Sequence, residues 1–332
     1  MIEGSNKIPL WYRGDDNSVS LYSSVRVCRN YKNMTFPSSK KCKDLKKCIE
    51  LTDALVMSKF PGMDIESADV SSLNTQKISF LQKFRILPAK EEDLLKNSRL
   101  YYFTEPQVFL LVNYYDHLNF FCHYKGESIE KAYSGCMKVV DAFEKDMFSR
   151  DSNGNYHTSD LGFFGSGLKL YSVLTLPSLM VKGNILTVKE SFGVNRISFR
   201  GFFGSVGKDP AIISSKDSFS KEPLAMTDEF TAVLRELRKT ALGVTVSKQE
   251  ERKIIEKNRE LFQRRHLTFG DFIDIYYMLS YMALKYRCKN VISELNMILA
   301  KLILSADGYS ENEAVVKDIT EEIIRISEKI IN

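Results

Sequence analysis

Two glycine turns carry the residues of this chain that are best suited to holding a phosphate. They are Gly162-Phe-Phe-Gly-Ser-Gly167, followed by Lys169, and Gly201-Phe-Phe-Gly-Ser-Val-Gly207, preceded by Arg200. Glycines let a backbone approach a phosphate closely, and neighbouring cations bind its oxygens. Neither turn fits a P-loop or a dinucleotide fingerprint, so structural turns with buried Phe side chains are the alternative interpretation.

Other common catalytic sites lack their characteristic spacings. The cysteines form no C-x-x-C pair or zinc pattern, the four histidines form no pair at helical spacing, and G-x-S-x-G is absent. A metal hydrolase or a serine hydrolase is therefore not expected, and no metal site is predicted. Reduced, packed thiols are typical of a cytoplasmic protein.

The charge is mildly basic and unevenly distributed. The 332 residues include 47 Lys+Arg and 42 Asp+Glu, and residues 1–50 hold ten basic and five acidic side chains. No run reaches the roughly 18–20 apolar residues of a membrane span, and the N-terminus lacks a signal pattern. The sequence thus predicts a cytoplasmic protein without a membrane segment.

Sequence patterns typical of strands and of helices occupy different parts of the chain. Segments rich in Val, Ile, Phe and Tyr predict strands, and apolar residues at helical spacing predict helices around 129–147 and 38–58. The predicted strands are 19–27, 108–113, 118–124, 169–180, 184–191 and 195–203. After residue 225 the pattern is helical, and Ser247-x-x-Glu250, Thr268-x-x-Asp271 and Ser310-x-x-Glu313 each look like a helix start. We therefore predict an α+β domain over 1–225 and an all-helical domain over 226–332.

Five stretches, in the same order, resemble the phosphagen (guanidino) kinase family, and most of all its bacterial protein arginine kinase branch. Tyr22–Asn30 is similar to the family's S-S-R-V-R-L-A-R-N, and Val112–Leu118 is similar to V-N-E-E-D-H-L. Tyr156–Leu168 contains a G-T-G-L-like turn, and Phe199–Gly204 is similar to V-R-G-L-Y-G. Arg287–Leu304 is similar to part of the family's helical tail. The resemblance implies a guanidino-kinase catalytic fold, an antiparallel sheet flanked by helices, followed by a small helical domain.

The residues that the resemblance assigns to catalysis are replaced. The family takes a guanidinium proton with carboxylates before attack on a γ-phosphate. Its two adjacent glutamates correspond to Tyr114 and Tyr115, a third carboxylate to Ser205, and its active-site Cys to Asp160. No catalytic residue is expected at those positions, and Asp160 or Asp116 is the fallback acid.

The family's phosphate clamp is reduced as well. By resemblance, Arg26 and Arg200 are retained, and Lys169 replaces a third arginine. Ser24 and Asn119 replace two further arginines. Each lost charge-assisted hydrogen bond is worth roughly 1.5–3 kcal/mol. In the tail, residues 312–317 replace the family's phosphoarginine-binding motif without either arginine.

Three functions stay open at this point. We favour a degenerate kinase (a pseudokinase) that acts as a binding or regulatory scaffold, with no cofactor expected. The second is a divergent but active ATP- and Mg²⁺-dependent protein arginine kinase. The third is nucleic-acid binding by a lysine-rich segment, which the modest net charge disfavours. The lysines are Lys40, Lys41, Lys43, Lys46 and Lys47.

The resemblance also implies partners. It suggests a zinc-binding activator protein and, more remotely, the Clp protease machinery. Residues 275–282 are apolar nearly all round a helix, which predicts burial by both the chain itself and a partner. We therefore expect a homodimer or a hetero-oligomer.

Overall fold

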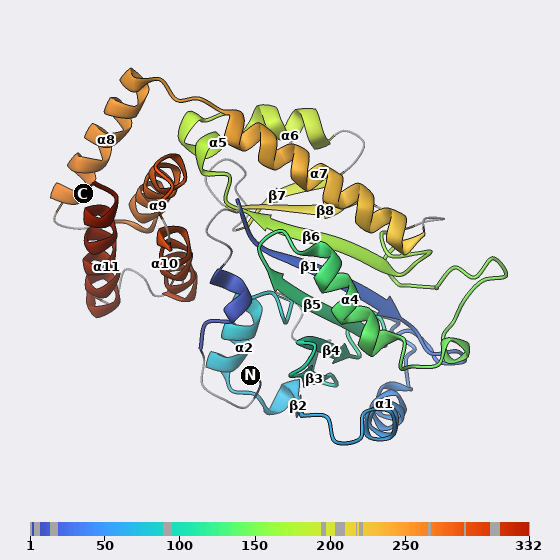
Figure 1. Ribbon diagram of the computed structural model, residues 1–332. Helices are drawn as coiled ribbons and strands as arrows, with labels where there is room; N and C mark the ends of the chain where they lie inside the picture. Colours follow the sequence, from blue (N-terminus) through green and yellow to red (C-terminus); the bar gives the residue numbers. More distant parts are fainter. Residues whose placement is uncertain are drawn as a thin grey trace.

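The computed structural model describes residues 2, 7–13, 19–88, 95–193, 197–202, 210–216, 218, 222–264, 267–288, 290–305 and 313–331. Its centre is an eight-stranded antiparallel sheet with strand order β2-β3-β4-β5-β1-β6-β8-β7 (Figure 1). The strands are β1 (Ser20–Arg29), β2 (Ile65–Asp69), β3 (Arg99–Phe103), β4 (Val108–Val112), β5 (Leu118–Lys125), β6 (Leu168–Leu174), β7 (Ile197–Gly201) and β8 (Ala211–Ser215).

Helices cover both faces of this sheet, and in the described part of the chain every element after residue 222 is a helix. They are α1 (Leu45–Lys59), α2 (Thr75–Lys83), α4 (Ile129–Val140), α5 (Pro177–Lys182), α6 (Ile185–Gly193), α7 (Pro223–Gly243), α8 (Lys248–Gln263), α9 (Phe269–Lys285), α10 (Val291–Ser305) and α11 (Glu313–Ile331). Short 3-10 helices are η1 (Leu10–Arg13), η2 (Val70–Ser72) and η3 (Lys145–Met147). The predicted α+β architecture, an antiparallel sheet with helices and a helical tail, is confirmed.

Strand β1 lies near the middle of the sheet because it pairs with β5 on one side and with β6 on the other. Successive side chains of a strand point to opposite faces. Val25 and Val27 therefore enter one core, together with side chains of α1, α4 and α7. Tyr22, Ser24 and Arg26 face the other side, where a cavity opens.

The second core joins that other side of the sheet to the C-terminal helices. Phe109 of β4, Phe84 just after α2, and Phe272 and Leu299 of α9 and α10 belong to one continuous cluster of buried side chains. Figure 1 shows α8 to α11 grouped beside the sheet, with η1 and α2 between them and the strands. The helical tail thus contributes to the wall of the cavity face.

Helix α9 is enclosed by the chain itself. Ile275, Tyr276, Leu279 and Tyr281 are buried, and α9 packs against α5, α8, α10 and α11. The sequence predicts that a partner covers part of the apolar surface of this helix. In the structure, neighbouring helices of the same chain cover it. An oligomer therefore needs another surface, and the oligomeric state stays a prediction.

Several element predictions need correction. Residues 184–191 form helix α6 rather than a strand, because the buried Ile185 and Val188 are spaced three apart and the Val188 N–H donates to the Asn184 carbonyl oxygen. The strand predicted over 169–180 ends at Leu174, and α5 follows. Helix α1 begins at Leu45 rather than Ser38, so Lys40, Lys41 and Lys43 precede it; all five lysines of this segment are exposed.

Two predicted helix starts are confirmed in detail. The Ser247 hydroxyl accepts from the Glu250 N–H at 3.2 Å, and the Glu250 carboxylate accepts from the Ser247 N–H at 2.8 Å. Thr268 and Asp271 form the same reciprocal pair at the start of α9. Ser310 lies outside the described residues. Each capping box satisfies two N–H groups that a helix start leaves free.

The boundary predicted between residues 225 and 226 stays a prediction. Helix α7, assigned by sequence to the second domain, packs its buried Phe230, Leu234 and Leu237 into the same core as α4 and β6. No helix among the described residues has the length and apolarity needed to cross a bilayer.

We predict that α7 is required for the stability of the sheet. Leu237 is fully buried, so Leu237→Ala is expected to lower the free energy of unfolding by about 2–5 kcal/mol. Leu224 on the same helix is 66% exposed, so Leu224→Ala is expected to cost less than about 0.5 kcal/mol. Urea unfolding of both variants measures the difference, and equal losses would contradict the packing of α7.

Candidate functional site

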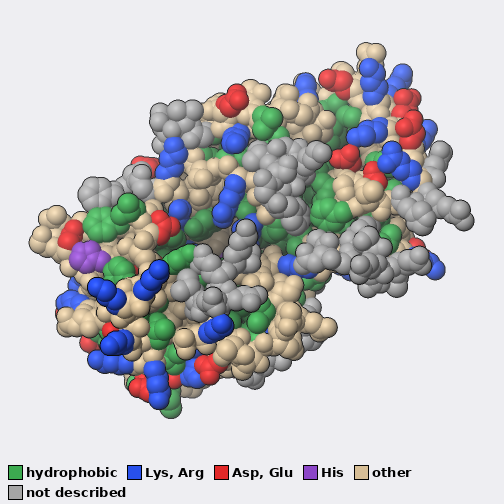
Figure 2. All heavy atoms as spheres, turned by 180° about the vertical axis from the view of Figure 1, so that it is seen from behind, with side chains coloured by type: hydrophobic (Ala, Val, Ile, Leu, Met, Phe, Trp, Pro, Cys, Tyr) green, Lys and Arg blue, Asp and Glu red, His purple; other side chains and the backbone are tan. Residues whose placement is uncertain are grey.

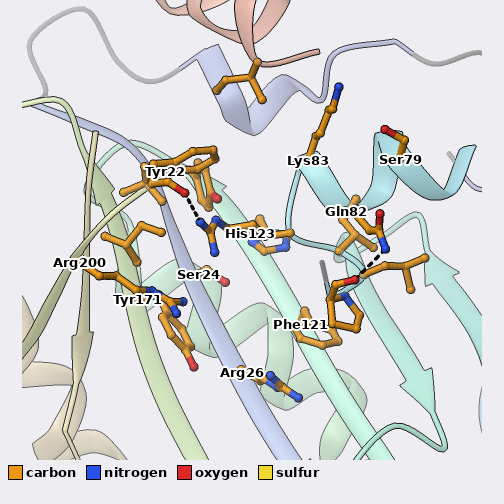
Figure 3. Close-up of a pocket in the computed structure, with 18 of the residues that line it drawn as sticks. Tyr22, Ser24, Arg26, Ser79, Gln82, Lys83, Phe121, His123, Tyr171 and Arg200 are labelled. Carbon is orange, nitrogen blue, oxygen red and sulfur yellow. Dashed lines mark hydrogen bonds between the residues drawn. The ribbon is translucent and has the colours of Figure 1, made fainter. Parts of the chain in front are cut away.

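A cavity of about 710 Å³ lies on the face of the sheet opposite α4 and α7. Its floor is formed by β1, β5, β6, β7 and β8, and its wall by α2, the segment after it, and one side chain of α10. The lining residues are Tyr22, Ser24, Arg26, Ser79, Gln82, Lys83, Arg85, Ile86, Leu87, Pro88, Tyr114, Phe121, His123, Tyr171, Val173, Arg200, Phe202, Ile212 and Ile303 (Figure 3). A volume of this size suits a small-molecule ligand.

The charge of this lining is of one sign. Among the described residues it contains four cationic side chains, Arg26, Lys83, Arg85 and Arg200, and no Asp or Glu. Figure 2 shows Lys and Arg side chains around a hollow of the molecular surface, with apolar side chains between them. Such a lining attracts an anion and repels a cation.

Arg26 is held in place by an amide and by aromatic rings. Its Nη2 donates to Oδ1 of Asn119 at 2.6 Å, and its guanidinium carbon lies 4.9 Å from the centre of the Phe121 ring and 5.2 Å from that of Phe163. Its Nε is buried without a hydrogen-bond partner among the described residues. Burial by itself lowers the pKa of Arg26, but neighbours that include Cys28 and Tyr171 reverse the effect, so the guanidinium keeps its charge.

The other cations predicted by sequence take different positions. Lys169 of β6 lies opposite Arg26 of β1 in the strand register, but it does not belong to the cavity lining. Its Nζ lies 5.3 Å from the centre of the Phe163 ring. Arg200 is exposed on the edge strand β7 and lines the cavity, as does Ser24. The structure thus brings Arg26, Ser24 and Arg200 to one cavity and places Lys169 beside it.

Two tyrosines occupy the place predicted for the replaced glutamates. Tyr114 lines the cavity, with its ring centre 5.9 Å from the Arg26 guanidinium carbon. Tyr115 contacts Tyr114 edge to face at 4.6 Å between ring centres. Ser205 lies outside the described residues. A Tyr side chain ordinarily has a pKa near 10, so it is not a base near neutral pH.

Neither fallback acid belongs to the cavity lining, although the charge of Asp116 acts on Arg26 and that of Asp160 acts on Tyr171. Both acids bind backbone or amide groups. Asp116 is buried, and its Oδ1 accepts from Asn30 Nδ2 at 2.6 Å and from the Ser159 N–H at 2.7 Å. Asp160 is exposed, and its Oδ1 accepts from the Gly162 N–H at 2.8 Å. Asp116 therefore fastens the segment around Ser159 to the end of β1, and Asp160 shapes the first glycine turn.

Sequence reasoning missed three residues of the lining. His123 is stacked on Trp11 with 5.2 Å between ring centres and 24° between ring planes, and neither of its ring nitrogens has a hydrogen-bond partner among the described residues. Burial lowers the pKa of His123 to about 3, so the ring is neutral. The Tyr22 hydroxyl is also buried without a partner, and Arg85 follows α2. Strand alternation from Phe121 could have placed His123 on this face, but no motif marks Arg85.

The first glycine turn has a structural role, and residues 203–207 of the second lie outside the described residues. The Gly167 φ is +69°, and a Cβ there would lie 2.2 Å from Arg29 Nη1 and 2.7 Å from the Cys28 carbonyl oxygen, so only glycine fits. Phe163 in the same turn is buried. Among the described residues, no group of three His, Cys, Asp or Glu side chains could hold a metal ion.

Comparison with known proteins relates this geometry to one family. The family described as ATP:guanido phosphotransferase, C-terminal catalytic domain, matches residues 49–240, more than half of the chain. The chain is 24% identical over 200 residues to a protein-arginine kinase of Clostridium tetani, a match covering 58% of this chain and 57% of that protein. It is 26% identical over 195 residues to a protein-arginine kinase of Caldanaerobacter subterraneus subsp. tengcongensis, covering 57% of each. The chain thus spans a little over half the length of these relatives.

Solved structures show the same fold at low sequence identity. A substrate-free duplicated taurocyamine kinase from Schistosoma mansoni superimposes with a TM-score of 0.55 and 15% identity, over 73% of this chain and 35% of that one. A lombricine kinase gives a TM-score of 0.55 and 14% identity, over 72% and 70% of the two chains. The antiparallel sheet, the order of the motifs and the extent of the family match agree, and this chain belongs to the ATP:guanido phosphotransferase family.

Proposed function

We propose that this chain is a degenerate relative of the protein-arginine kinases, a pseudokinase that acts by binding rather than by phosphoryl transfer. The observation that carries the proposal is the charge of the cavity lining: four cations and, among the described residues, no carboxylate. Such a site can hold an anion. In the part of the chain that the structure describes, the lining offers no carboxylate to take a proton from a guanidinium.

The chemistry of the reaction explains why this matters. Attack of a guanidinium nitrogen on a phosphoryl group needs removal of a proton and close positioning of two reactants. Burial raises the pKa of Tyr22 and of Tyr171 to about 12, so neither phenol supplies a base at neutral pH. Asp116, the acid closest in sequence to the replaced glutamates, is committed to Asn30 and Ser159.

ATP is the phosphoryl donor that the family name implies, and the residues fit it only in part. Arg26 and Arg200 would contact its phosphates, with Lys169 beside them. Arg26 already donates to Asn119 and lies among aromatic rings, so one of its five N–H donors is in use. We therefore propose that nucleotide binding is weak.

An active, divergent kinase is the second candidate, and one observation favours it. Gly162 lies between a carboxylate and an ammonium group: a Cβ built there would be 2.9 Å from Lys169 Nζ and 3.2 Å from Asp160 Oδ1. An exposed acid next to a phosphate-binding cation could orient a guanidinium substrate. In that case Asp160 would be the base and ATP with Mg²⁺ the co-substrate.

The proposed partners rest on the relatives rather than on a surface of this chain. A zinc-binding activator protein, the Clp protease machinery, and a homodimer or hetero-oligomer remain our proposals. We also propose a cytoplasmic location, which is supported by the six cysteines, all of which are free thiols. For the five lysines around the start of α1 we propose a solvated surface, and nucleic-acid binding stays the disfavoured alternative.

A phosphorylation assay tests the proposal directly. With radiolabelled ATP, Mg²⁺ and arginine-rich protein substrates, we expect no acid-labile phosphoarginine above background. The protein-arginine kinase of Clostridium tetani serves as the positive control. Robust phosphoarginine that disappears in Asp160→Asn would favour the divergent kinase and overturn the pseudokinase.

Restoring one arginine of the clamp is expected to strengthen nucleotide binding. Ser24 lines the cavity between Arg26 and Tyr22, so Ser24→Arg places a second guanidinium beside the first. A charge-assisted hydrogen bond of roughly 1.5–3 kcal/mol corresponds to an affinity gain of about 10- to 150-fold for ATP–Mg²⁺ in calorimetry.

The control for this variant is Ser198→Arg, which adds the same charge at an exposed position on β7 outside the lining. It is expected to leave the affinity within about twofold of wild type, because a surface charge is screened by salt. Equal gains from both variants would show a general charge effect and would contradict the assignment of Ser24 to the phosphate site.

The oligomeric state is open to a simple measurement. We expect light scattering at micromolar concentration to give a mass of at least twice the 38.1 kDa of one chain. Co-purification with a zinc-binding protein would support the activator proposal. A monodisperse monomer that captures no such protein would argue against both assemblies.

A further inference from the structure

The sheet has two edge strands, and β2 is the one whose outer side is exposed. In the described sheet β2 pairs with β3 alone and β7 pairs with β8 alone, and Figure 1 shows β2 at the border of the sheet, beyond β3. Ile197, Phe199 and Gly201 of β7 are buried. Ser67 and Asp69 of β2 are exposed. An exposed edge strand offers unpaired N–H and C=O groups to another extended chain.

The register with β3 decides which backbone groups of β2 point outward. In an antiparallel pair, residues that hydrogen-bond to the partner strand alternate with residues that do not. Just before β2, the Asp64 carbonyl oxygen accepts from the Thr104 N–H at 3.2 Å. Just after it, the Val70 N–H donates to the Ser98 carbonyl oxygen at 2.9 Å. The even-numbered residues of β2 therefore bind β3, and the N–H and C=O groups of the odd-numbered residues point away from it.

The outward groups of β2 are available for a further strand. In the part of the chain that the structure describes, no hydrogen bond uses the backbone N–H or C=O of Ile65 or Ser67. The Asp69 carbonyl oxygen accepts from the Ser72 hydroxyl at 2.7 Å, but a carbonyl oxygen has a second lone pair. Three successive outward positions can thus each form backbone hydrogen bonds with a neighbouring strand.

A second copy of β2 matches this edge. Antiparallel pairing about a twofold axis at Ser67 places Ser67 opposite the same residue of the second copy, and Ile65 opposite Asp69. These pairs join odd-numbered residues to odd-numbered residues, so the outward N–H and C=O groups of one strand meet those of the other. The contact is isologous, because the same strand serves both copies, and it closes as a dimer.

The side chains of β2 are compatible with this pairing. The register sets Glu66 opposite Ala68 and Ile65 opposite Asp69, so no two acidic residues lie directly opposite each other. Arg99 Nε donates to Asp69 Oδ1 at 2.8 Å, which places a cation beside this carboxylate. Like charges directly opposite each other destabilise a pair of strands, and the twofold register avoids them.

Exposed apolar side chains lie beside the same edge. Met63 comes two residues before β2 and is 40% exposed. Met57 of α1 is 78% exposed and lies three residues before Phe60. The Phe60 ring centre is 5.0 Å from that of Phe103, which is the register partner of Ile65. Association at this edge is favoured where it removes such apolar surface from water.

We propose that the chain forms a homodimer through β2, which pairs in antiparallel fashion with β2 of a second copy and joins the two sheets into one. The twofold axis passes between the two Ser67 residues. The inference rests on the homodimer of the proposed function and names the surface that forms it. It concerns assembly alone and holds whether or not the chain transfers phosphoryl groups.

A charge at the twofold axis tests this pairing. Because Ser67 faces its own copy, Ser67→Asp places two carboxylates opposite each other, and Ser67→Lys places two ammonium groups there. Each variant alone is expected to dimerise about tenfold more weakly than wild type or worse, because like charges are forced together. An equimolar mixture of the two variants is expected to regain the dimer, since opposite charges then meet. Light scattering over a series of protein concentrations measures all three samples.

Ser152→Asp is the matched control for the charge. Ser152 is exposed in the loop after η3, outside β2, so this variant adds the same charge away from the proposed interface. Its dimerisation is expected to stay within about twofold of wild type, because salt screens a distant surface charge. Circular dichroism checks that every variant is folded, which is expected because Ser67 is exposed.

Cross-linking provides a second test that does not rely on repulsion. In a hydrogen-bonded antiparallel pair the two Cα atoms are about 5.5 Å apart, within the range of roughly 4.4–6.8 Å that a disulfide spans. Oxidised glutathione is therefore expected to convert the Ser67→Cys variant into a covalent dimer, seen on non-reducing electrophoresis. The Ser152→Cys variant and wild type, in which Cys42 and Cys288 are half-buried, serve as controls.

The outcomes separate the interface from the homodimer itself. If wild type dimerises and Ser67→Asp dimerises equally well, the homodimer stands and the β2 interface is overturned. The interface is also overturned if Ser152→Cys cross-links as efficiently as Ser67→Cys. A wild-type monomer at micromolar concentration overturns both the interface and the homodimer, and it leaves an extended segment of another protein as the occupant of this edge.

Discussion

The pairing of β1 between β5 and β6 is the constraint on which the rest of the molecule depends. Because side chains alternate along a strand, β1 sends one set of side chains into the core under α4 and α7 and the other set to the face that carries the cavity. Val25 and Val27 pack against the helices of the first face. Tyr22, Ser24 and Arg26 line the cavity on the second. A shift of β1 by one residue would exchange the two sets, so the large core enforces the register of the site.

The described lining of the cavity contains cationic side chains but no carboxylate that balances their charge. In folded proteins a cation near the interior normally has an acidic partner, because burial of an unpaired charge is costly. Here Arg26 has an amide and aromatic rings, and Arg85 has a backbone carbonyl and a Phe ring. Carbonyl and ring contacts stabilise a guanidinium without neutralising it. The protein therefore keeps a site whose net charge is available to an anionic ligand.

The helical tail and the sheet contribute side chains to one buried core. Phe272 and Leu299 belong to the same buried cluster as Phe84 and Phe109, and Ile303 of α10 reaches the cavity lining. Side chains of α5, α8, α10 and α11 cover α9. The tail therefore forms part of the wall of the cavity.

The order of the motifs and the local sequence patterns predict the family and the antiparallel sheet with its helical tail, and both are confirmed. That Tyr114 and Tyr115 stand where the family has glutamates stays a prediction from the resemblance. Those conclusions rest on residue types in a fixed order and on local patterns such as the Ser247 capping box. The sequence pattern predicts a strand rather than a helix over residues 184–191, because Ile and Val favour strands locally and only their packing selects a helix. Only the folded chain shows that Asp116 accepts a hydrogen bond from Asn30 and that Asn119 accepts one from Arg26. It also brings Arg85 to Phe202, over one hundred positions away in the chain, where Arg85 Nη2 donates to the Phe202 carbonyl oxygen at 2.8 Å. Contacts between distant segments carry no local sequence signal, since they depend on how whole elements fill a common core.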